Sequence, residues 1–481
     1  MTPYEIFFYG GTFFLIGVFG ASMGLAPFFI TMGVIVIMGI IAMFDMPTVR
    51  KWACALLSLL VIVGSLYFRV DDAKFRSSPI PFGGGIEFSG VVKSDPVIAE
   101  GAQTMQVMLR NPEVRVLITT KPYPRFSYGD EVSGMGIILA PPENGYARYL
   151  EKERIRGLMR YPSIEQGGVS SGERFQRMLY EVKHAIVQAY ERILPPEEAT
   201  FLSGLTIGAR GTLRDELKTA MQQSGTTHLV ALSGYNITIL AYVVMSMLLL
   251  FSSRRVAFII ATLIIVCFVI MTGAEASVVR AAIIGFLVLV AREMGRGHSM
   301  RNIILCAGII MVLLNPKVLV FDVGFQLSFL ALLGIIYVRP ALLMLFHVSE
   351  KDSTLFSWRD NFLTTLSAQL TTLPVLVINF GMFSPISLIS NIVILEFIPL
   401  TMALGFLAAF TSFISYHLSF VIGLLAMIFL KIELWCIYTF ARISIPIEFK
   451  MSVMYVALYF TGIVVLVWWY YRKKKYDGRI I

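Results

Sequence analysis

Charged residues are scarce in this 481-residue sequence, since Asp, Glu, Lys and Arg make up only 15% of it. A soluble globular domain typically carries about 25% charged residues, so the composition excludes an ordinary soluble protein. Several long runs contain no charged residue; they cover 6–44, 229–253, 256–274, 361–395, 397–430 and 451–471. A helix needs about 20 such residues to cross a bilayer. The sequence therefore predicts a polytopic α-helical membrane protein with about 10–12 spans.

Other features are also missing, and each absence narrows the function. The four cysteines, all in apolar stretches, cannot form an extramembrane disulfide or a CxxC metal site; they are Cys54, Cys267, Cys306 and Cys436. The five histidines are isolated, so no metal-dependent nuclease motif is present in the sequence. No GxxxxGK[ST] loop occurs, so an ATP-driven motor would be a separate protein. We therefore expect no metal, no cofactor and no catalytic residues, and we also expect no cleavable signal peptide because no basic region precedes the first apolar run.

Basic loops orient the expected spans. Lys and Arg favour cytoplasmic loops, which predicts a cytoplasmic side for Arg50–Lys51, Arg254–Arg255, 292–301 and Arg472–Lys475. This places spans in residues 1–68 and puts the following segment outside the cytoplasm. The remaining organisation is an extracytoplasmic domain at 69–170, amphipathic or interfacial helices at 171–228, and a second transmembrane domain at 229–481.

The inserted segment has the pattern of a small β domain. Short stretches rich in β-branched residues alternate with Gly, Pro and Asn turns; the expected strands are Ile86–Lys93, Thr104–Arg110, Val114–Thr120 and Glu131–Leu139. Strands of this number and length suit an OB-like barrel. Such barrels often bind single-stranded nucleic acid or sugars, although a fold alone does not establish a function. Residues 173–194 read as a charged amphipathic helix on the outer membrane surface.

Four groups of residues occur in a characteristic order along the apolar half. They are HLVALSGYNITI at 228–239, EASVVRA at 275–281, DVGFQLSFLA at 322–331, and the later LP at 373–374, FG at 380–381, SP at 384–385 and Asn391. Upstream, Gly204, Gly208, Arg210 and the stretch PPENGYARYL at 141–150 extend the pattern. Together these stretches resemble the ComEC-type competence family. Where the first motif of that family usually has a second histidine, this sequence has Asn236.

The resemblance implies a channel in the bacterial cytoplasmic (inner) membrane that passes single-stranded transforming DNA into the cytoplasm. It also implies partners: an external DNA receptor, a separate nuclease and a separate motor, besides the lipid bilayer. Many members continue into a metallo-β-lactamase-like domain, which we do not expect here. Because Asn236 replaces the second histidine, a two-histidine site is not carried over.

Polar residues in apolar spans are costly to bury, so they are candidates for a pathway. The candidate set is Arg210, His228, Ser233, Gly234, Asn236, Glu275, Arg280, Asp322, Gln326 and Ser328. Ser233 and Gly234 are expected to break a helix whose freed backbone lines a pathway. Glu275 and Arg280 either pair with each other or face a wet path, and Asp322 is expected to cap a helix.

Basic and aromatic residues of the inserted domain are candidates for gripping a single strand. The basic ones are Lys93, Arg110, Arg115, Lys121 and Arg125, and the aromatic ones are Tyr123, Phe126 and Tyr128. The alternative for these residues is an ordinary solvated face.

Two further functions stay open. One is an intramembrane enzyme that acts on a lipid or cell-wall substrate through His228, Ser233 and Glu275, although no oriented base or oxyanion hole is visible. The other is a transporter of a different polymer or of a small molecule.

Overall fold

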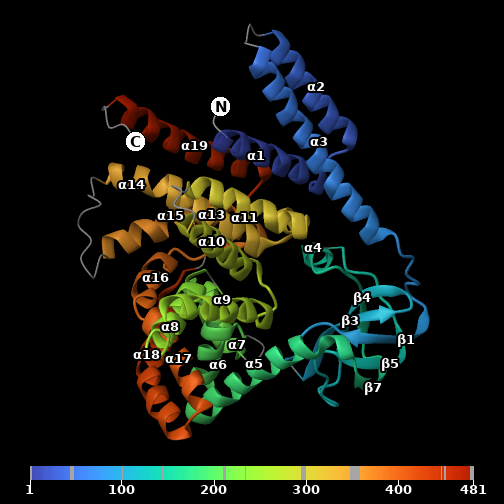
Figure 1. Cartoon of the computed structure of the whole chain (residues 1–481), viewed down its shortest axis with the longest axis vertical. Helices are drawn as coiled ribbons and strands as arrows, with labels where there is room; N and C mark the ends of the chain where they lie inside the picture. The colour runs from blue at the N-terminus through green and yellow to red at the C-terminus, as the bar shows by residue number, and fades with distance from the viewer. Residues whose placement is uncertain are drawn as a thin grey trace. The chain divides into compact units, whose positions relative to one another are not determined.

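The computed structural model describes residues 3–43, 48–99, 101–143, 145–209, 213–232, 234–293, 299–346, 358–445, 447–448 and 451–476. The chain folds into two compact units (Figure 1). The first consists of Met1–Glu181 and Val266–Asp322, and the second of Val182–Ile265 and Val323–Ile481.

The helices of the first unit come from both of its segments. They are α1 (Pro3–Ser22), α2 (Pro27–Met43), α3 (Thr48–Arg76), α4 (Gly145–Lys152), α10 (Ala276–Glu293), α11 (Met300–Leu314) and α12 (Val318–Phe321). Glycines let α1 and α3 approach closely. A side chain at Gly17 would collide with the carbonyl of Val61, and one at Gly64 with the carbonyl of Phe14. The two helix backbones therefore touch where the glycines lie.

A mixed sheet forms a separate part of the first unit, and its expected position outside the membrane stays a prediction. Its strands are β1 (Gly85–Val92), β2 (Val97–Ala99), β3 (Ala102–Arg110), β4 (Glu113–Thr120), β5 (Asp130–Ile137), β6 (Ile155–Arg160) and β7 (Ser163–Val169). The order is β6-β4-β3-β1-β5-β7, with β2 beside β3. Only β4 and β6 run parallel among these pairs. Buried and less buried residues alternate along β3 and β4, so one face of these strands packs on a core that includes Val107, Val116 and Ile118.

The four expected strands are confirmed to within two residues, but the expected barrel is not. β6 and β7 form the two ends of the sheet, so the strands do not close into a ring. Leu139 and Leu158 form an isolated bridge, with backbone N to O distances of 2.8 and 2.9 Å. β7 is mostly exposed and contains two adjacent glycines near its end, which weakens pairing at this edge. The OB-like assignment remains a prediction.

A long helix, α5 (Arg174–Ile193), follows the one-turn helix η1 (Ser171–Glu173), as the charged amphipathic pattern predicted. Its first turns are fixed to the sheet domain by polar contacts. Arg177 pairs with the buried carboxylate of Asp130 at 2.7 Å, and the Tyr128 hydroxyl contacts Glu173 at 2.5 Å. The position of α5 at a membrane surface stays a prediction.

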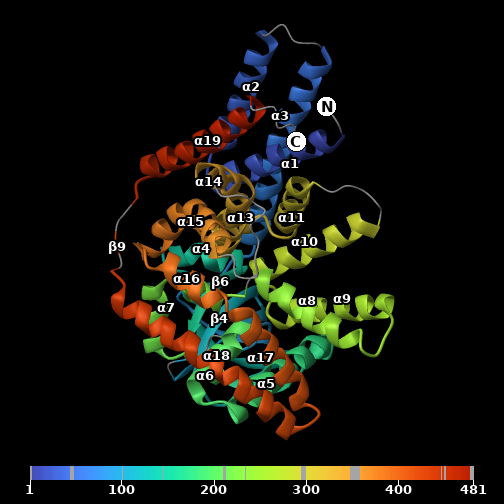
Figure 2. The same ribbon diagram turned by 90° about the vertical axis from the view of Figure 1, so that its left-hand side faces the viewer.

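The second unit is almost entirely helical. It contains α6 (Pro196–Ile207), α7 (Asp215–Ser224), η2 (Thr227–Leu229), α8 (Gly234–Leu248), most of α9 (Arg254–Met271), α13 (Val323–Leu333), η3 (Gly334–Val338), α14 (Arg339–Leu345), α15 (Trp358–Phe380), α16 (Ser387–Leu395), α17 (Ile398–Ser412), α18 (Tyr416–Ile443) and α19 (Val453–Tyr476), with the short pair β8 (Met382–Phe383) and β9 (Ile447–Glu448). Figure 2 shows α17 and α18 side by side. Their facing sides share a core with α6 and α7 that includes Phe201, Leu217, Met402 and Leu430.

Several helices are suited to a bilayer. Within the described ranges, six are long and apolar enough to cross one, or seven if the pair α16 and α17, bent by 48°, counts as one broken span. Four more apolar helices have 10–17 residues. The protein is therefore a membrane protein, and the expected total of 10–12 spans stays a prediction because these four are short.

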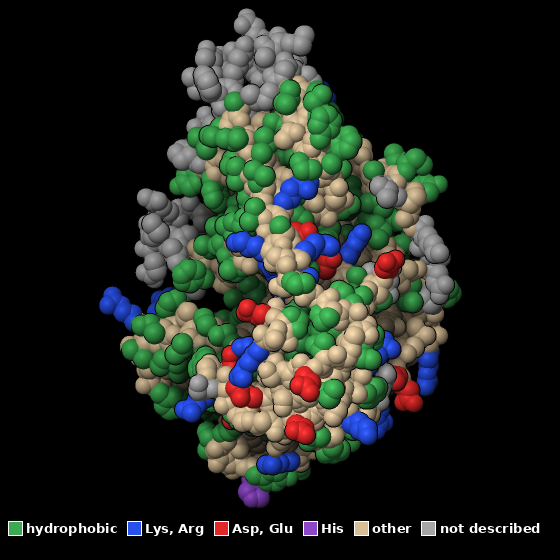
Figure 3. All heavy atoms as spheres, turned by 90° about the vertical axis from the view of Figure 1, so that its right-hand side faces the viewer, with side chains coloured by type: hydrophobic (Ala, Val, Ile, Leu, Met, Phe, Trp, Pro, Cys, Tyr) green, Lys and Arg blue, Asp and Glu red, His purple; other side chains and the backbone are tan. Residues whose placement is uncertain are grey.

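The surface carries both apolar and charged areas. On the face drawn in Figure 3, hydrophobic side chains dominate one part, and basic and acidic side chains are interspersed in another. On this face there is no continuous basic stripe among the residues drawn in colour. A nucleic-acid contact there would have to rest on a local group of residues rather than on a broad positive surface.

Candidate functional site

Two short helices, α6 and α7, lie inside the helical unit. They have 12 and 10 residues, and at about 1.5 Å per residue neither reaches across a bilayer. Every α6 residue from Phe201 to Ile207 is buried. Each helix ends at a glycine in the left-handed region, Gly208 at φ +70° and Gly225 at φ +71°. The carbonyls of the last turn of such a helix have no partner within the helix and need one elsewhere.

The signature motif supplies a partner at the end of α6. Asn236, in the first turns of α8, is buried, and its Nδ2 donates to the carbonyl oxygen of Leu205 at 2.9 Å. Leu205 belongs to the last turn of α6, so the Asn236 side chain satisfies one of the carbonyls that the helix end leaves open. Asn236 stands where the family motif usually has its second histidine. In this chain the residue at that position acts as a hydrogen-bond donor to the end of α6.

The end of α7 is capped by three serine hydroxyls from distant parts of the chain. Ser384 and Ser444 each donate to the carbonyl oxygen of Gln223 at 2.6 Å. Ser390, in α16, donates to the carbonyl oxygen of Ser224 at 2.7 Å. The late SP segment and the signature region therefore meet at one turn, which we call the capped turn (Gln223–Gly225).

Close packing reinforces the capped turn. A side chain at Gly225 would collide with Ser387, whose hydroxyl accepts a hydrogen bond from Gln369 Nε2 of α15 at 3.2 Å. A pocket of about 470 Å³ adjoins the turn, and it is lined by Asp215, Glu216, Thr219, Ala220, Gln223, Tyr438, Ala441 and Arg442. The broken backbone is thus held in a defined position, with its carbonyls bonded to protein side chains rather than open to a pathway.

The remaining signature residues are only partly placed. Arg210 and Ser233 lie outside the described residues. His228 lies in η2 with an exposed side chain, and Gly234 begins α8. The expected helix break with pathway-lining backbone at Ser233 and Gly234 stays a prediction. The alternative of an intramembrane enzyme acting through His228, Ser233 and Glu275 stays a hypothesis, because Ser233 lies outside the described residues.

Glu275 and Arg280 lie at the start of α10. The Glu275 carbonyl accepts the amides of Val278 and Val279, both at 3.0 Å, so Glu275 stands at the helix N-terminus. Both side chains are half-buried, as are Gln326 and Ser328 in α13. Their role on a pathway stays a prediction.

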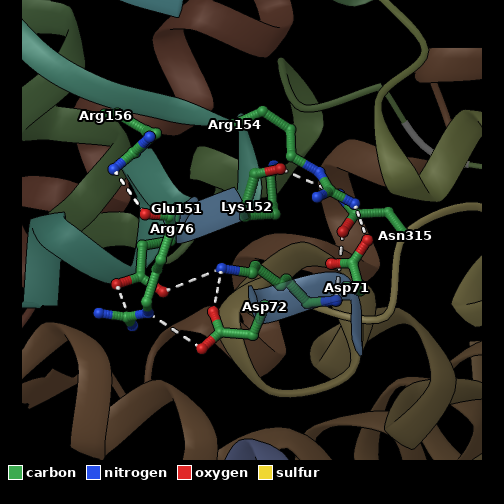
Figure 4. Close-up of polar contacts among 9 residues, drawn as sticks. Asp71, Asp72, Arg76, Glu151, Lys152, Arg154, Arg156 and Asn315 are labelled. Carbon is green, nitrogen blue, oxygen red and sulfur yellow. Dashed lines mark hydrogen bonds and ion pairs between the residues drawn. The ribbon is translucent and has the colours of Figure 1, made fainter. Parts of the chain in front are cut away.

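Asp322 directly precedes α13, and its expected role as a helix cap stays a prediction. The residue is buried, and its carboxylate pairs with Lys152 of α4 at 3.2 Å. Nearby, the fully buried Lys317 pairs with Asp72 at 2.8 Å and with Glu151 at 3.3 Å. Figure 4 shows the side chains of Asp72 from α3, Glu151 from α4 and Asn315 from the α11–α12 connection converging in this region. The first residue of the DVGFQLSF motif is therefore tied to the sheet domain.

The surrounding charges complete this group. Arg154 pairs with Asp71 at 2.7 Å, and Arg76 pairs with Asp72 at 2.9 Å. Burial alone would raise the pKa of the Asp72 carboxyl, but the hydrogen bonds and charges of Lys317 and Arg76 outweigh it and lower that pKa. Burial would lower the pKa of the Lys152 ammonium, but Glu153 and Asp322 outweigh it and raise that pKa. Both of these groups are thus held in their charged forms.

The basic residues of the sheet domain are mostly occupied. Lys93 pairs with Glu173, and Arg110 pairs with Glu131 at 2.5 Å. Arg115 donates to the Glu153 carbonyl at 3.3 Å. Lys93 and Arg110 also line a pocket of about 250 Å³ together with the acidic Glu113. A DNA phosphate would have to displace carboxylates there.

Two of the proposed stacking aromatics are buried, which corrects the sequence interpretation. Phe126 belongs to the sheet core and Tyr128 is also buried, each 5% exposed, so neither can stack on a base. Tyr123 is 68% exposed, and the Arg125 guanidinium lies 5.5 Å from its ring centre. Lys121 and Arg125 are exposed as well. The β4–β5 loop therefore retains the features of a single-strand contact.

Sequence reasoning missed several residues of the site. Lys317 interrupts an apolar stretch directly after Asn-Pro, and a lone lysine there was a usable signal. Glu433 is fully buried in α18, where its Oε1 lies 2.6 Å from the Thr401 hydroxyl. An acid inside a long apolar helix was also a signal. Of the three capping serines, only Ser384 had a recognisable sequence signal, because it belongs to the SP motif. Ser390 and Ser444 had none, because serine is common in apolar spans.

Comparisons with known proteins agree with the motifs. The family model described as Competence protein matches residues 205–473. ComE operon protein 3 of Bacillus subtilis (strain 168) is 31% identical over 253 residues, which are 52% of this chain and 31% of that protein. The chain thus matches about a third of the length of this curated relative. No solved structure matches.

Proposed function

Since the chain belongs to the competence protein family, we propose that it is a multi-pass channel that conducts single-stranded DNA inward across the bacterial cytoplasmic membrane. The match to residues 205–473 carries the proposal, because it includes α7, α8 and α15–α18. The matched range holds α7 and Ser384, Ser390 and Ser444, which form the capped turn (Gln223–Gly225). A broken, internally satisfied backbone within a helical bundle is a recurring feature of membrane transport proteins.

The outer domain would make the first contact with DNA through its β4–β5 loop. Tyr123 offers an exposed ring face, and Lys121 and Arg125 supply positive charge beside it. Base stacking on an aromatic side chain contributes about 1–3 kcal/mol and tolerates any sequence. Lys93 and Arg110 are weaker candidates for DNA contact, because each is already paired with a carboxylate.

The same proposal assigns the remaining steps to partners. An external receptor would deliver DNA, a separate nuclease would remove the second strand, and a separate motor would supply energy. In this proposal the chain itself carries out no covalent chemistry.

A gene deletion with complementation tests the function. We expect deletion to abolish entry of labelled DNA into the cytoplasm, and the native gene to restore it. The double substitution Ser384→Ala with Ser444→Ala should complement poorly, because it leaves the Gln223 carbonyl without its caps. Ser252→Ala is the matched control, since Ser252, in the turn after α8, donates to the nearby carbonyl of Leu248 at 2.8 Å. Uptake that continues unchanged after deletion would refute the channel.

A binding measurement on the full chain in lipid nanodiscs tests the loop. Tyr123→Ala should weaken the binding of a short single strand by about 1–3 kcal/mol. Tyr161→Ala is the control, because Tyr161 is also exposed, at 61%, and is not in the loop. Affinity should fall as salt rises, since phosphate contacts release counterions. Equal effects of the two substitutions would remove the loop from the proposal.

A further inference from the structure

Two neighbouring residues of α4 carry opposite charges and pair with opposite charges on either side of α12. Glu151 pairs with Lys317 at 3.3 Å, and Lys152 pairs with Asp322 at 3.2 Å. Lys317 directly precedes α12, and Asp322 directly follows it. We call these two contacts the crossed ion pairs (Glu151–Lys317 and Lys152–Asp322). They join α4, which leads into the sheet, to the start of the DVGFQLSF motif.

The crossed ion pairs are too buried to be ordinary surface contacts. The Lys317 side chain is fully buried, and those of Asp322, Lys152 and Glu151 are 10%, 18% and 26% exposed. Removing charges from water offsets most of their attraction, so apolar residues of similar size would often be as stabilising. Buried charges do, however, discriminate strongly between alternative arrangements, because a displaced partner leaves a charge unpaired or facing a like charge. The pattern therefore favours a role in specifying one position.

Further contacts fix the same junction. The Asn315 amide donates to the Lys152 carbonyl at 2.9 Å, and the ammonium of Lys317 lies 3.7 Å from the ring centre of Phe75 in α3. α4 leads directly into β6, which pairs with β4 in the sheet. The crossed ion pairs thus act on an element that is continuous with the sheet, and a shift of α4 would carry the sheet with it.

We propose that Lys152 and Lys317 are positioning residues for DNA passage, which hold the sheet domain in one register against α3 and α12. This inference rests on the proposed channel function. In it, the crossed ion pairs add little to stability and instead keep the DNA-contacting domain aligned with the membrane helices. Activity should then require a complementary pair of charges at these positions, whichever residue carries which sign.

The test compares a neutral pair with a reversed pair in the full chain in its native membrane. Lys152→Met with Asp322→Asn removes both charges of this pair, and it also takes the Lys152 ammonium away from Glu153, which lies 2.8 Å from it. Lys152→Glu with Asp322→Lys restores the pair with its signs exchanged. Lys152→Arg is the conservative variant. Lys218→Met removes an exposed pair with Asp215 and serves as control.

Three readouts are taken for each variant: the amount of folded protein, hydrogen exchange of segments 145–160 and 315–322, and DNA uptake. We expect the neutral pair to accumulate and melt like the native protein, to exchange faster in both segments, and to take up DNA about tenfold more slowly. The reversed pair should recover most of the native exchange rate and most of the native DNA uptake. The recovery should be incomplete, because the carboxylate introduced at position 152 would adjoin Glu153. Lys152→Arg and Lys218→Met should behave like the native protein.

Two outcomes would overturn the positioning role. One is a neutral pair with native exchange and native uptake, which would make the contacts dispensable. The other is a reversed pair no better than Lys152→Glu alone, which would show that the two residues do not act through each other. If gene deletion leaves uptake unchanged, the channel proposal fails, whereas the exchange measurements still decide whether the crossed ion pairs position the sheet domain.

Discussion

The sheet domain and the helical unit satisfy their backbones in different ways. In the sheet, strands such as β3 and β4 exchange hydrogen bonds along their whole length. In the helical unit, α6 and α7 end in the interior, and their last carbonyls depend on side chains 31 to 221 residues away in the sequence. Many backbone hydrogen bonds between neighbouring strands thus stabilise the sheet, whereas the ends of α6 and α7 depend on a few side-chain hydrogen bonds. Substitutions of single polar side chains should be tolerated in the sheet and costly in the bundle.

The largest effect is expected from removing all caps of the capped turn. Replacing Ser384, Ser390 and Ser444 with alanine leaves the carbonyls of Gln223 and Ser224 without these partners, the first in a partly buried place and the second in a buried one. At roughly 1–3 kcal/mol for each unsatisfied carbonyl, the unfolding free energy should fall by about 2–6 kcal/mol. Thermal unfolding in detergent micelles measures this. An unchanged melting temperature would show that the bundle does not depend on these contacts.

Gly225→Ala is expected to have the next largest effect. The left-handed backbone costs a side chain about 1–2 kcal/mol, and the added methyl also collides with Ser387. Gly24→Ala separates the two causes, because Gly24 has φ +82° but nothing within 4 Å of an added methyl. Unfolding of both variants should show a larger loss at Gly225. Equal losses would mean that packing at the capped turn is loose.

Substitutions of Asn236 test the hydrogen bond that caps the end of α6. They also test the effect of having asparagine where the family motif usually has histidine. Asn236→Leu should cost about 1–3 kcal/mol, because the Leu205 carbonyl loses its donor. Asn236→His should cost less, since an imidazole N–H can also donate to a carbonyl. Unfolding measurements on the two variants give the order. A histidine variant as unstable as the leucine variant would show that shape, rather than donation, fixes this position.

A smaller, pH-dependent effect is expected where the sheet domain meets the helices. Lys317 and Arg76 lower the pKa of the Asp72 carboxyl despite its burial. A lowered folded-state pKa stabilises the protein above the unfolded value of about 3.9, and this contribution is lost as pH falls through the folded-state value. The native melting temperature should therefore decline below about pH 4, and less steeply in Asp72→Asn. Parallel pH profiles for the two proteins would contradict the assignment.

The smallest effect is expected at an exposed pair of the sheet. Arg110 and Glu131 lie 2.5 Å apart, with side chains 57% and 38% exposed. Exposed pairs contribute about 0–1 kcal/mol, so Arg110→Ala should barely change the unfolding temperature. A loss as large as that of a buried cap would erase the contrast between the two regions.

Local patterns predicted the local features of this fold. Alternating residues located β1, β3, β4 and β5, because a half-buried strand imposes a period of two. β6 and β7 were missed, since IRGLMR and SIEQGGV are short and rich in glycine and charge. The apolar runs located the helices but could not fix the number of spans, because several helices are short or bent.

The site was harder to predict than the elements. The motif resemblance was confirmed by the family match, but it did not reveal that Ser390 meets Ser224, since 166 residues separate them. Phe126 and Tyr128 were misplaced, because an aromatic residue in a turn-rich segment looks the same whether it enters the core or the solvent. For Asp322 the sequence predicted a local role at the start of a helix, and it could not reveal the ion pair with Lys152, which is 170 residues away in the sequence.

The contact between α1 and α3 has a mechanical consequence. Gly17 and Gly64 each face a carbonyl of the opposite helix, so sliding one helix past the other would drive a side chain into the backbone. We therefore expect α1 and α3 to resist sliding along their axes and to move together. Because the sheet domain follows α3 in the sequence, a displacement of that domain would be passed on through α3 to α1.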